Sequence, residues 1–270
     1  MSVRSSVAPT ARKLPGPGAG HRGGRRRRRP GWVPNQHGAW AMLSAPLLVG
    51  TLASGPRWAH LLLAAFWFAG YLAFFAATLW LKSRRRPRHL APVQVYVALA
   101  TALGAALLLV EPTLVRWAPL FVVPLSVGMV ASATRHERAL IAGLATAAGS
   151  CLMTPVAYDL GPGERWTVAW ILTGVLAGYF TGTVFYVKSA IRRRGSTVFL
   201  LLSVGYHLLL AVLALALLPH GARLPLGGLA LVLAVRAAAV PRLGWSPARL
   251  GVGEIVATLA VVVLALTTLV

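Results

Sequence analysis

Nine long apolar segments follow one another along the chain, separated by short basic or polar stretches. They cover about residues 39–54, 58–81, 93–110, 117–134, 139–157, 166–187, 197–218, 224–240 and 252–270. Each approaches the ~17–25 residues that an α-helix needs to cross the hydrocarbon core of a bilayer. The runs are continuous, whereas the strands of a membrane barrel alternate in polarity over ~10 residues. The sequence therefore predicts an all-α polytopic membrane helical bundle with about nine transmembrane helices, of which the first is short and contains Pro46 and Gly50.

The composition indicates a membrane protein and excludes an ordinary soluble enzyme. Hydrophobic residues make up 57% of the chain and charged residues 12%, whereas soluble domains carry about 25% charged residues. The net charge is +22, from 27 Lys and Arg against 5 Asp and Glu. Such an excess is typical of proteins that meet nucleic acid or an anionic membrane surface, and the apolar segments favour the membrane. We therefore expect membrane lipids with anionic headgroups as partners, no nucleic acid, and a location in the inner (plasma) membrane.

The distribution of basic residues predicts how the segments are threaded. If the N-terminus is cytoplasmic and the segments alternate in direction, the cytoplasmic stretches hold 23 of the Lys and Arg residues. The outer loops keep one each, namely Arg57, Arg116, Arg165 and Arg223. Every inner stretch then carries more basic residues than any outer loop, as the positive-inside rule requires. We predict nine spans, with the N-terminus inside and the C-terminus outside.

Residues 1–31 differ from the rest of the chain. They are rich in Pro, Gly, Ser and Arg and lack apolar periodicity, which predicts a disordered basic cytoplasmic tail ahead of a single transmembrane helical domain at residues 32–270. The run 25–29 is interpreted as an anchor for anionic headgroups, with a nucleic-acid arm as the alternative. A secretory signal peptide cleaved near Ala53 is a second alternative. The long basic stretch and the polar residues 35–37 favour an uncleaved first span.

A few polar side chains stand out beside or within the apolar segments. His207 sits ten residues into its segment, near the bilayer midplane, where ionisable groups are costly and usually functional. The alternative is a neutral histidine that is hydrogen-bonded to a neighbouring helix. Tyr179 and Tyr186 share one helix face and either line a pocket or lie at the membrane interface. Asn35 suits a helix N-cap, which leaves the adjoining Gln36 and His37 without a structural explanation.

Glu254 lies near the cytoplasmic start of the last segment. A carboxylate in the first turn of a helix is favoured by the helix dipole, so a capping role is one interpretation. An ion pair with Arg236 of the preceding segment is the other. In the segment 166–187, Gly174, Gly178 and Gly182 recur at steps of four, a spacing that permits the close approach of a neighbouring helix.

Common catalytic motifs are missing from the chain. It contains no GxGxxG, Walker loop, HExxH or GxSxG pattern. Only two carboxylates are assigned to the cytoplasmic side, too few for a divalent-metal diphosphate site there. The single cysteine, Cys151, excludes an intrachain disulfide and a cysteine metal cage. We therefore predict no metal site and no cofactor.

Residues 34–42 (PNQHGAWAM) resemble the signature of the YwiC-like family of bacterial membrane proteins. Softer similarities are found at residues 135–138 (RHER), 185–192 (FYVKSAIR), 206–207 (YH) and 253–256 (GEIV). The resemblance covers residues 32–270 and implies a membrane protein without implying a particular chemistry.

The layout is also similar, more distantly, to that of UbiA-type intramembrane prenyltransferases, which have nine helices and active-site motifs in the loops after helices 2 and 6. The corresponding stretches here, residues 78–84 and 186–192, contain no Asp or Glu. The metal ligands of those enzymes therefore have no counterpart in this chain, and only Tyr186 and Lys188 loosely match residues that contact a diphosphate.

Three functions stay open at this stage. The first is an intramembrane pocket, facing the cytoplasm, for an anionic lipid or an isoprenoid-type ligand, and its candidate ligand-binding residues are Gln36, His37, Arg84, Tyr186, Lys188 and Arg192. If the protein is an enzyme, the candidate catalytic residues are His37, Tyr186 and His207. The second is a small-solute or proton-coupled transporter that uses His207, with Glu254 and Arg236 as relay partners. The third is a non-catalytic membrane subunit or assembly factor.

Overall fold

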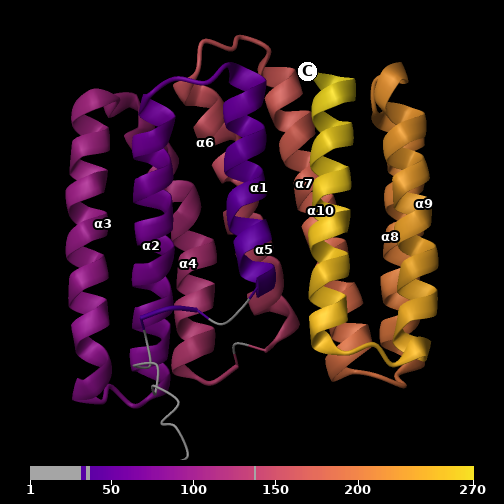
Figure 1. The fold of residues 1–270 in the computed structure, drawn as a ribbon, viewed down its shortest axis with the longest axis horizontal. Helices are drawn as coiled ribbons and strands as arrows, with labels where there is room; N and C mark the ends of the chain where they lie inside the picture. Colours follow the sequence, from indigo (N-terminus) through magenta and orange to yellow (C-terminus); the bar gives the residue numbers. More distant parts are fainter. Residues whose placement is uncertain (1–31, 35–36, 137) are drawn as a thin grey trace, which may run out of the picture.

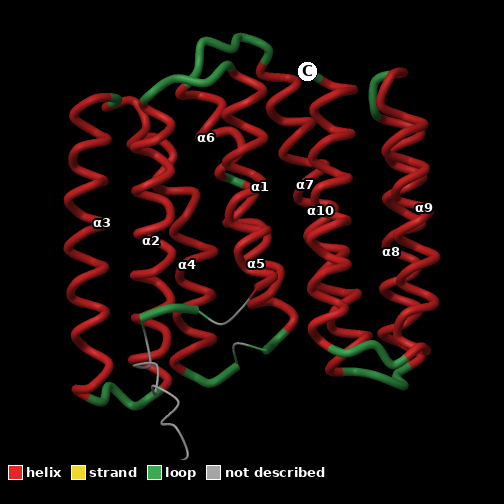
Figure 2. The backbone as a smooth tube through the Cα atoms, viewed as in Figure 1, coloured by secondary structure: helices red, strands yellow, loops and turns green. Residues whose placement is uncertain are grey.

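The computed structural model describes residues 32–270 except residues 35, 36 and 137, and it leaves the side chains of residues 37 and 38 undescribed. Every regular element within the described part is helical (Figure 2), which confirms the predicted all-α class. The long elements are α1 His37–Ser54, α2 Ala59–Lys82, α3 Leu90–Val110, α4 Ala118–Ala133, α5 Leu140–Cys151, α6 Met153–Leu160, α7 Trp166–Val187, α8 Thr197–Leu217, α9 His220–Leu243 and α10 Pro247–Leu269. Three short turns, η1 Pro87–His89, η2 Pro112–Trp117 and the π-helical η3 Lys188–Arg192, join or extend them.

Within the described residues, eight helical segments are long and apolar enough to cross a bilayer, and a ninth, Ala39–Ser54, is shorter. The helices run alternately up and down in a single bundle (Figure 1). This is the architecture of a polytopic membrane protein, as the sequence predicts.

The alternation places the loops at two opposite ends of the bundle (Figure 1). The loops after α2, α4, α7 and α9 lie at one end. We call it the basic end, because the first three of these connections carry several Lys and Arg residues and Arg242 and Arg249 flank the fourth. The loops after α1, α3, α6 and α8 lie at the other end with Val270, here called the distal end. The distal end holds two ion pairs, Arg57 with Glu111 at 3.5 Å and Arg116 with Asp159.

The segment 139–157, predicted as one helix, consists of the two helices α5 and α6 with Leu152 between them. Pro155 explains the break, because its ring excludes the carbonyl of the residue four positions earlier, which is Cys151. The shifted α6 packs closely against α1. A Cβ atom on Gly50 of α1 would overlap the carbonyl oxygen of Thr154 in α6, so this contact requires glycine.

Small and aliphatic side chains fill the space between the helices. One buried cluster joins α1, α5, α7, α9 and α10 around Val49, Leu172, Leu176 and Ala265. A second joins α1, α2, α3, α6 and η2 around Leu63, Leu107, Trp117 and Ala157. In Figure 1, α7 lies behind α10 and α8 lies behind α9, so these four helices form one side of the bundle. They position the candidate site.

Candidate functional site

A polar cluster lies between α7, α9 and α10, surrounded by apolar side chains. We call it the Glu254 cluster, and its members are Tyr179, Thr183 and Tyr186 of α7, Arg236 of α9, and Glu254 and Thr258 of α10. The α-helical period brings these residues together, because positions three, four or seven apart share one face of a helix. Each of the three helices thus turns one polar face toward the same point.

The centre of the cluster is a buried ion pair. Arg236 Nη2 lies 2.8 Å from Glu254 Oε1, and the two side chains are 16% and 9% exposed. These two atoms are close without the alignment of a hydrogen bond. Arg236 Nη1 donates to the carbonyl of Gly253 at 3.3 Å, while its Nε is buried and has no hydrogen-bond partner among the described residues. The guanidinium carbon lies 4.2 Å from the centre of the Tyr186 ring, in cation–π geometry.

The second carboxylate oxygen of Glu254 is held by hydroxyl groups. Thr183 Oγ1 donates to Oε2 at 2.8 Å, and the Tyr179 hydroxyl lies 3.3 Å from the same oxygen. Tyr179 also shares a hydrogen bond with Thr258 Oγ1 at 3.0 Å. The carboxylate is therefore bound on one side by a cation and on the other by hydroxyls that can either donate or accept.

The capping interpretation of Glu254 is wrong. Helix α10 begins at Pro247, so Glu254 lies two turns inside it, and Ser246 is the residue that caps the helix by accepting from the backbone N–H of Arg249. The sequence pattern missed the extra turns because residues 247–251 are only weakly apolar. The alternative interpretation, the ion pair with Arg236, is confirmed.

An apolar cavity of about 330 Å³ lies next to the cluster, between α7, α8, α9 and α10. We call it the α7–α10 groove. Its lining residues are Ile171, Gly174, Val175, Tyr179, Leu210, Leu213, Ala214, Leu217, Leu218, Leu226, Leu229, Ala230, Leu233 and Val261. Tyr179 alone among them is polar, and it belongs to both the groove and the Glu254 cluster.

The groove and the cluster lie on the same helix faces. On α7 the face of Ile171 and Val175 continues through Tyr179 to Thr183, and on α9 the face of Leu233 continues to Arg236. These continuations run toward the basic end. The three helices and α8 therefore frame one elongated site, apolar toward the distal end and charged toward the basic end.

The three glycines that recur at steps of four in α7 do not share one role. A Cβ atom on Gly178 would meet Leu210, and one on Gly182 would meet the His207 ring, so both glycines permit close packing against α8. At Gly174 a Cβ would meet nothing within 4 Å. This glycine opens onto the groove and is exposed.

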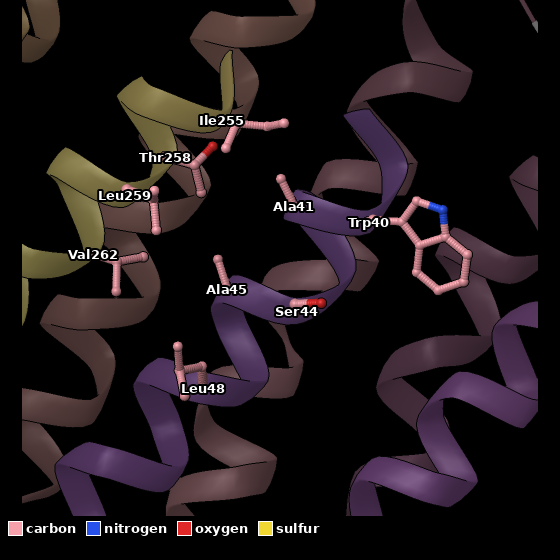
Figure 3. Close-up of a pocket in the computed structure, with 9 residues that line it drawn as sticks. All are labelled: Trp40, Ala41, Ser44, Ala45, Leu48, Ile255, Thr258, Leu259 and Val262. Carbon is pink, nitrogen blue, oxygen red and sulfur yellow. The ribbon is translucent and has the colours of Figure 1, made fainter. Parts of the chain in front are cut away.

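A second cavity of about 300 Å³ lies between α1 and α10. Figure 3 shows Ala41, Ala45 and Leu48 of α1 facing Thr258 and the neighbouring side chains of α10. Trp40 points away from α10 and packs against Phe68 and Tyr71 of α2. Thr258 lines this cavity and also bonds to Tyr179, which lines the α7–α10 groove, so the Glu254 cluster contacts both cavities.

Of the predicted catalytic candidates, Tyr186 belongs to the cluster and His207 lies beside it. Tyr186 is buried and stacks on Arg236. His207 is 1% exposed, packs against Gly182 and interacts electrostatically with Arg236 and Glu254. Its Nδ1 lies 2.7 Å from the carbonyl of Ser203, so its hydrogen-bond partner is on its own helix.

The other predicted ligand-binding residues lie away from the two cavities or outside the described part. Lys188 and Arg192 are in η3 at the basic end, where Lys188 donates to the carbonyl of Arg138 at 3.2 Å. Arg84 is exposed in the turn after α2, on the other side of the bundle. Gln36 and the side chain of His37 lie outside the described residues. The structure thus places Tyr186 and His207 at the same polar cluster, each interacting with Arg236. It separates Arg84 from Lys188 and Arg192.

Of the six cluster members, only Tyr186 was among the residues predicted for the ligand pocket, whereas Arg236 and Glu254 were named as relay partners of a transporter. Tyr179 and Tyr186 were recognised as sharing a face, but the sequence did not show that Thr183 and Thr258 would complete it. A periodic signal existed, because Thr183 follows Tyr179 and Thr258 follows Glu254 at a spacing of four. In the described residues, no group of three or more His, Cys, Asp or Glu side chains is placed to hold a metal ion.

Comparison with known proteins decides the family. The model of the family described as YwiC-like protein matches residues 33–158. The protein YwiC of Bacillus subtilis (strain 168), described as uncharacterised, is 34% identical over 187 residues, which are 67% of this chain and 76% of that protein. This chain belongs to the YwiC-like family. An uncharacterised protein of Haemophilus influenzae is 28% identical to this YwiC-like chain over 209 residues, 69% of the chain and 82% of the relative.

No solved structure matches this YwiC-like protein. The stretch that the family model matches ends in α6. The Glu254 cluster and the α7–α10 groove lie beyond it, in the last four long helices.

Proposed function

We propose that this YwiC-like protein binds an acidic amphiphile, a molecule with a long apolar chain and a carboxylate or phosphate head. The chain lies in the α7–α10 groove and the head lies at Arg236. The observation that carries the proposal is the continuity of the two regions, because the apolar walls of the groove lead along shared helix faces to a buried guanidinium. Anionic lipids and isoprenoid phosphates share this chemistry.

The groove has the size and lining of a ligand site. Its volume of about 330 Å³ falls at the lower end of the roughly 300–1,000 Å³ that small-molecule pockets occupy. Such pockets are mostly apolar with a few polar groups that orient the ligand, and here Tyr179 is the polar group at the inner end. Gly174, Leu213 and Leu217 are exposed on the outside of the bundle, which gives a ligand dissolved in the bilayer lateral access.

Arg236 has the geometry to recognise an acidic head. The Nε and Nη2 groups lie on one edge of the guanidinium. Among the described residues Nε has no hydrogen-bond partner, and Nη2 is held by its ion pair with Glu254 Oε1 at 2.8 Å, without an aligned hydrogen bond. Two parallel N–H groups on one edge match the two oxygens of a carboxylate or phosphate. The guanidinium carbon lies over the Tyr186 ring, so the ring blocks the approach of an oxyanion from that side.

The proposal also includes the orientation of the bundle in the membrane. The basic end carries the Lys and Arg residues of the connections after α2, α4 and α7, together with Arg242 and Arg249. The positive-inside rule assigns such an end to the cytoplasm. The protein would then lie in the inner membrane with Arg236 in the cytoplasmic half. The exposed basic residues would contact anionic headgroups, and each such contact would stabilise membrane attachment by about 1 kcal/mol.

The test is ligand binding in nanodiscs of phosphatidylcholine, read by native mass spectrometry. Palmitate, a polyprenyl monophosphate and phosphatidylglycerol are offered separately, which distinguishes fatty acid, isoprenoid and lipid as the source of the acidic head. Gly174→Leu fills the groove, whereas Gly228→Leu adds the same side chain to an exposed position on α9 with open space around it.

We expect at least one acidic probe to bind stoichiometrically to the wild type and to Gly228→Leu, and to be lost or weakened at least tenfold in Gly174→Leu. Equal retention in the two glycine variants, or no retained probe in the wild type, would contradict the proposal.

A further inference from the structure

We infer that Glu254 takes up one proton each time an acidic ligand binds at Arg236, so that binding of the anion is coupled to protonation of the carboxylate. This inference rests on the proposed function and adds its regulation. The reason is that two acidic groups, the Glu254 carboxylate and the head of the ligand, compete for the buried guanidinium of Arg236.

Charge balance in the Glu254 cluster gives the first argument. Arg236 and Glu254 form a neutral pair, both largely buried among apolar side chains. An ionised head that entered beside Arg236 would leave the cluster with one uncompensated negative charge, and uncompensated buried charges are strongly unfavourable. A proton on Glu254 removes that charge. The anion then takes the place of the carboxylate as the partner of Arg236, and the net charge of the cluster stays unchanged.

The hydrogen bonds around Glu254 suit either protonation state. In the ionised state Thr183 donates to Oε2 at 2.8 Å. Once protonated, the carboxyl group becomes a donor, and the hydroxyls of Tyr179 and Thr183 can turn to accept. Thr258 Oγ1 already donates to the backbone carbonyl of Glu254 at 2.7 Å and keeps lone pairs for Tyr179. The hydroxyl groups beside Oε2 can therefore stay hydrogen-bonded to the carboxyl group when the proton arrives.

Other titratable groups around Glu254 define the rival proton sites. Tyr179 and Tyr186 approach from α7, His207 from α8 and Arg236 from α9. The α1 residues that face α10 across the second cavity are not titratable. His207 is the rival that must be tested, because a histidine can also gain a proton near neutral pH.

The experiment counts protons during binding. A long-chain alkyl sulfonate serves as the probe, because its head stays ionised and any proton taken up belongs to the protein. Calorimetric titration of the full chain in phosphatidylcholine nanodiscs is run at one pH in two buffers of different ionisation enthalpy, with empty nanodiscs subtracted. The wild type is compared with Glu254→Gln and with His207→Asn, and the melting temperature of each variant is recorded.

We expect uptake of close to one proton per bound sulfonate in the wild type and in His207→Asn, and uptake near zero in Glu254→Gln. The wild-type affinity should fall as pH rises, by up to tenfold per pH unit, and the affinity of Glu254→Gln should be flat over that range.

Binding by the wild type without proton uptake overturns the coupling and leaves the proposed function standing. The absence of binding overturns both. Uptake that persists in Glu254→Gln, or that is lost in His207→Asn, also overturns the inference. If Glu254→Gln fails to fold, the proton counts of the wild type and of His207→Asn still test the inference. A wild type that takes up no proton, or a loss of uptake in His207→Asn, overturns it.

Discussion

At the residue scale, the unusual feature of this protein is a charged pair inside a bundle that carries few acidic groups. Glu111, Asp159 and Glu164 lie at the distal end, whereas Glu254 lies two turns inside α10 and contacts Arg236. Sequence reasoning could flag His207 from residue type and depth, and Tyr186 from its helix spacing and the distant similarity to prenyltransferases. It could offer the Arg236–Glu254 pair only as one of two alternatives, because which helices become neighbours depends on tertiary packing.

Removing one partner of this pair should destabilise the protein more than removing both. We predict that Arg236→Met lowers the free energy of unfolding by about 3–5 kcal/mol, because Glu254 is left as an uncompensated buried charge. The double variant Arg236→Met/Glu254→Leu should recover most of that loss. Thermal unfolding in detergent measures both, with Arg242→Met, an exposed arginine of the same helix, as the control. A double variant no more stable than the single one would contradict this account of the pair.

At the element scale, the sequence predicted the helices well and their interruptions poorly. The apolar runs set the positions of the long helices to within a few residues, because length and hydropathy are nearly sufficient in a membrane. The break between α5 and α6 was missed, although Pro155 was visible in the sequence. A proline in an apolar run can kink a helix or end it, and only the packing of α6 against α1 shows which occurs.

The contact of α1 with α6 gives a direct prediction. Gly50→Ala should destabilise the protein by about 1–3 kcal/mol, because the new methyl group would overlap the Thr154 carbonyl and lie 2.8 Å from the Ala157 Cβ. Gly70→Ala in α2, where nothing lies within 4 Å of the added atom, should be neutral or stabilising by up to about 1 kcal/mol. Melting temperatures in one detergent compare the two. Equal effects would show that α1 and α6 are not packed this closely.

At the scale of the whole molecule, the helices alternate in direction and the basic residues of the loops gather at one end of the bundle. The charge pattern predicted which loops share an end, and the structure places those loops together (Figure 1). The predicted tail at residues 1–31 lies outside the described residues. The site was predicted less well, because a groove between four helices depends on side-chain volumes that hydropathy does not report.

The orientation is testable with reporters at Val270. We predict that alkaline phosphatase fused there is active and that a fluorescent protein fused there is dark, since the C-terminus lies at the distal end and the positive-inside rule places that end outside. Fusions after Lys82, at the basic end, should behave in the opposite way. A bright fluorescent fusion at Val270 would reverse the assignment of the two ends.

The most direct measurement of the central claim is photolabelling with palmitate that carries a diazirine at the end of its chain. With the head at Arg236, the chain end should reach the distal part of the groove and label the peptides around Ile171–Val175 and Leu213–Leu218. Labelling should fall sharply in Gly174→Leu and stay unchanged in Gly228→Leu. Label spread evenly over lipid-facing helices such as α3 and α4, with no enrichment at the groove, would contradict the claim that these four helices form a binding site.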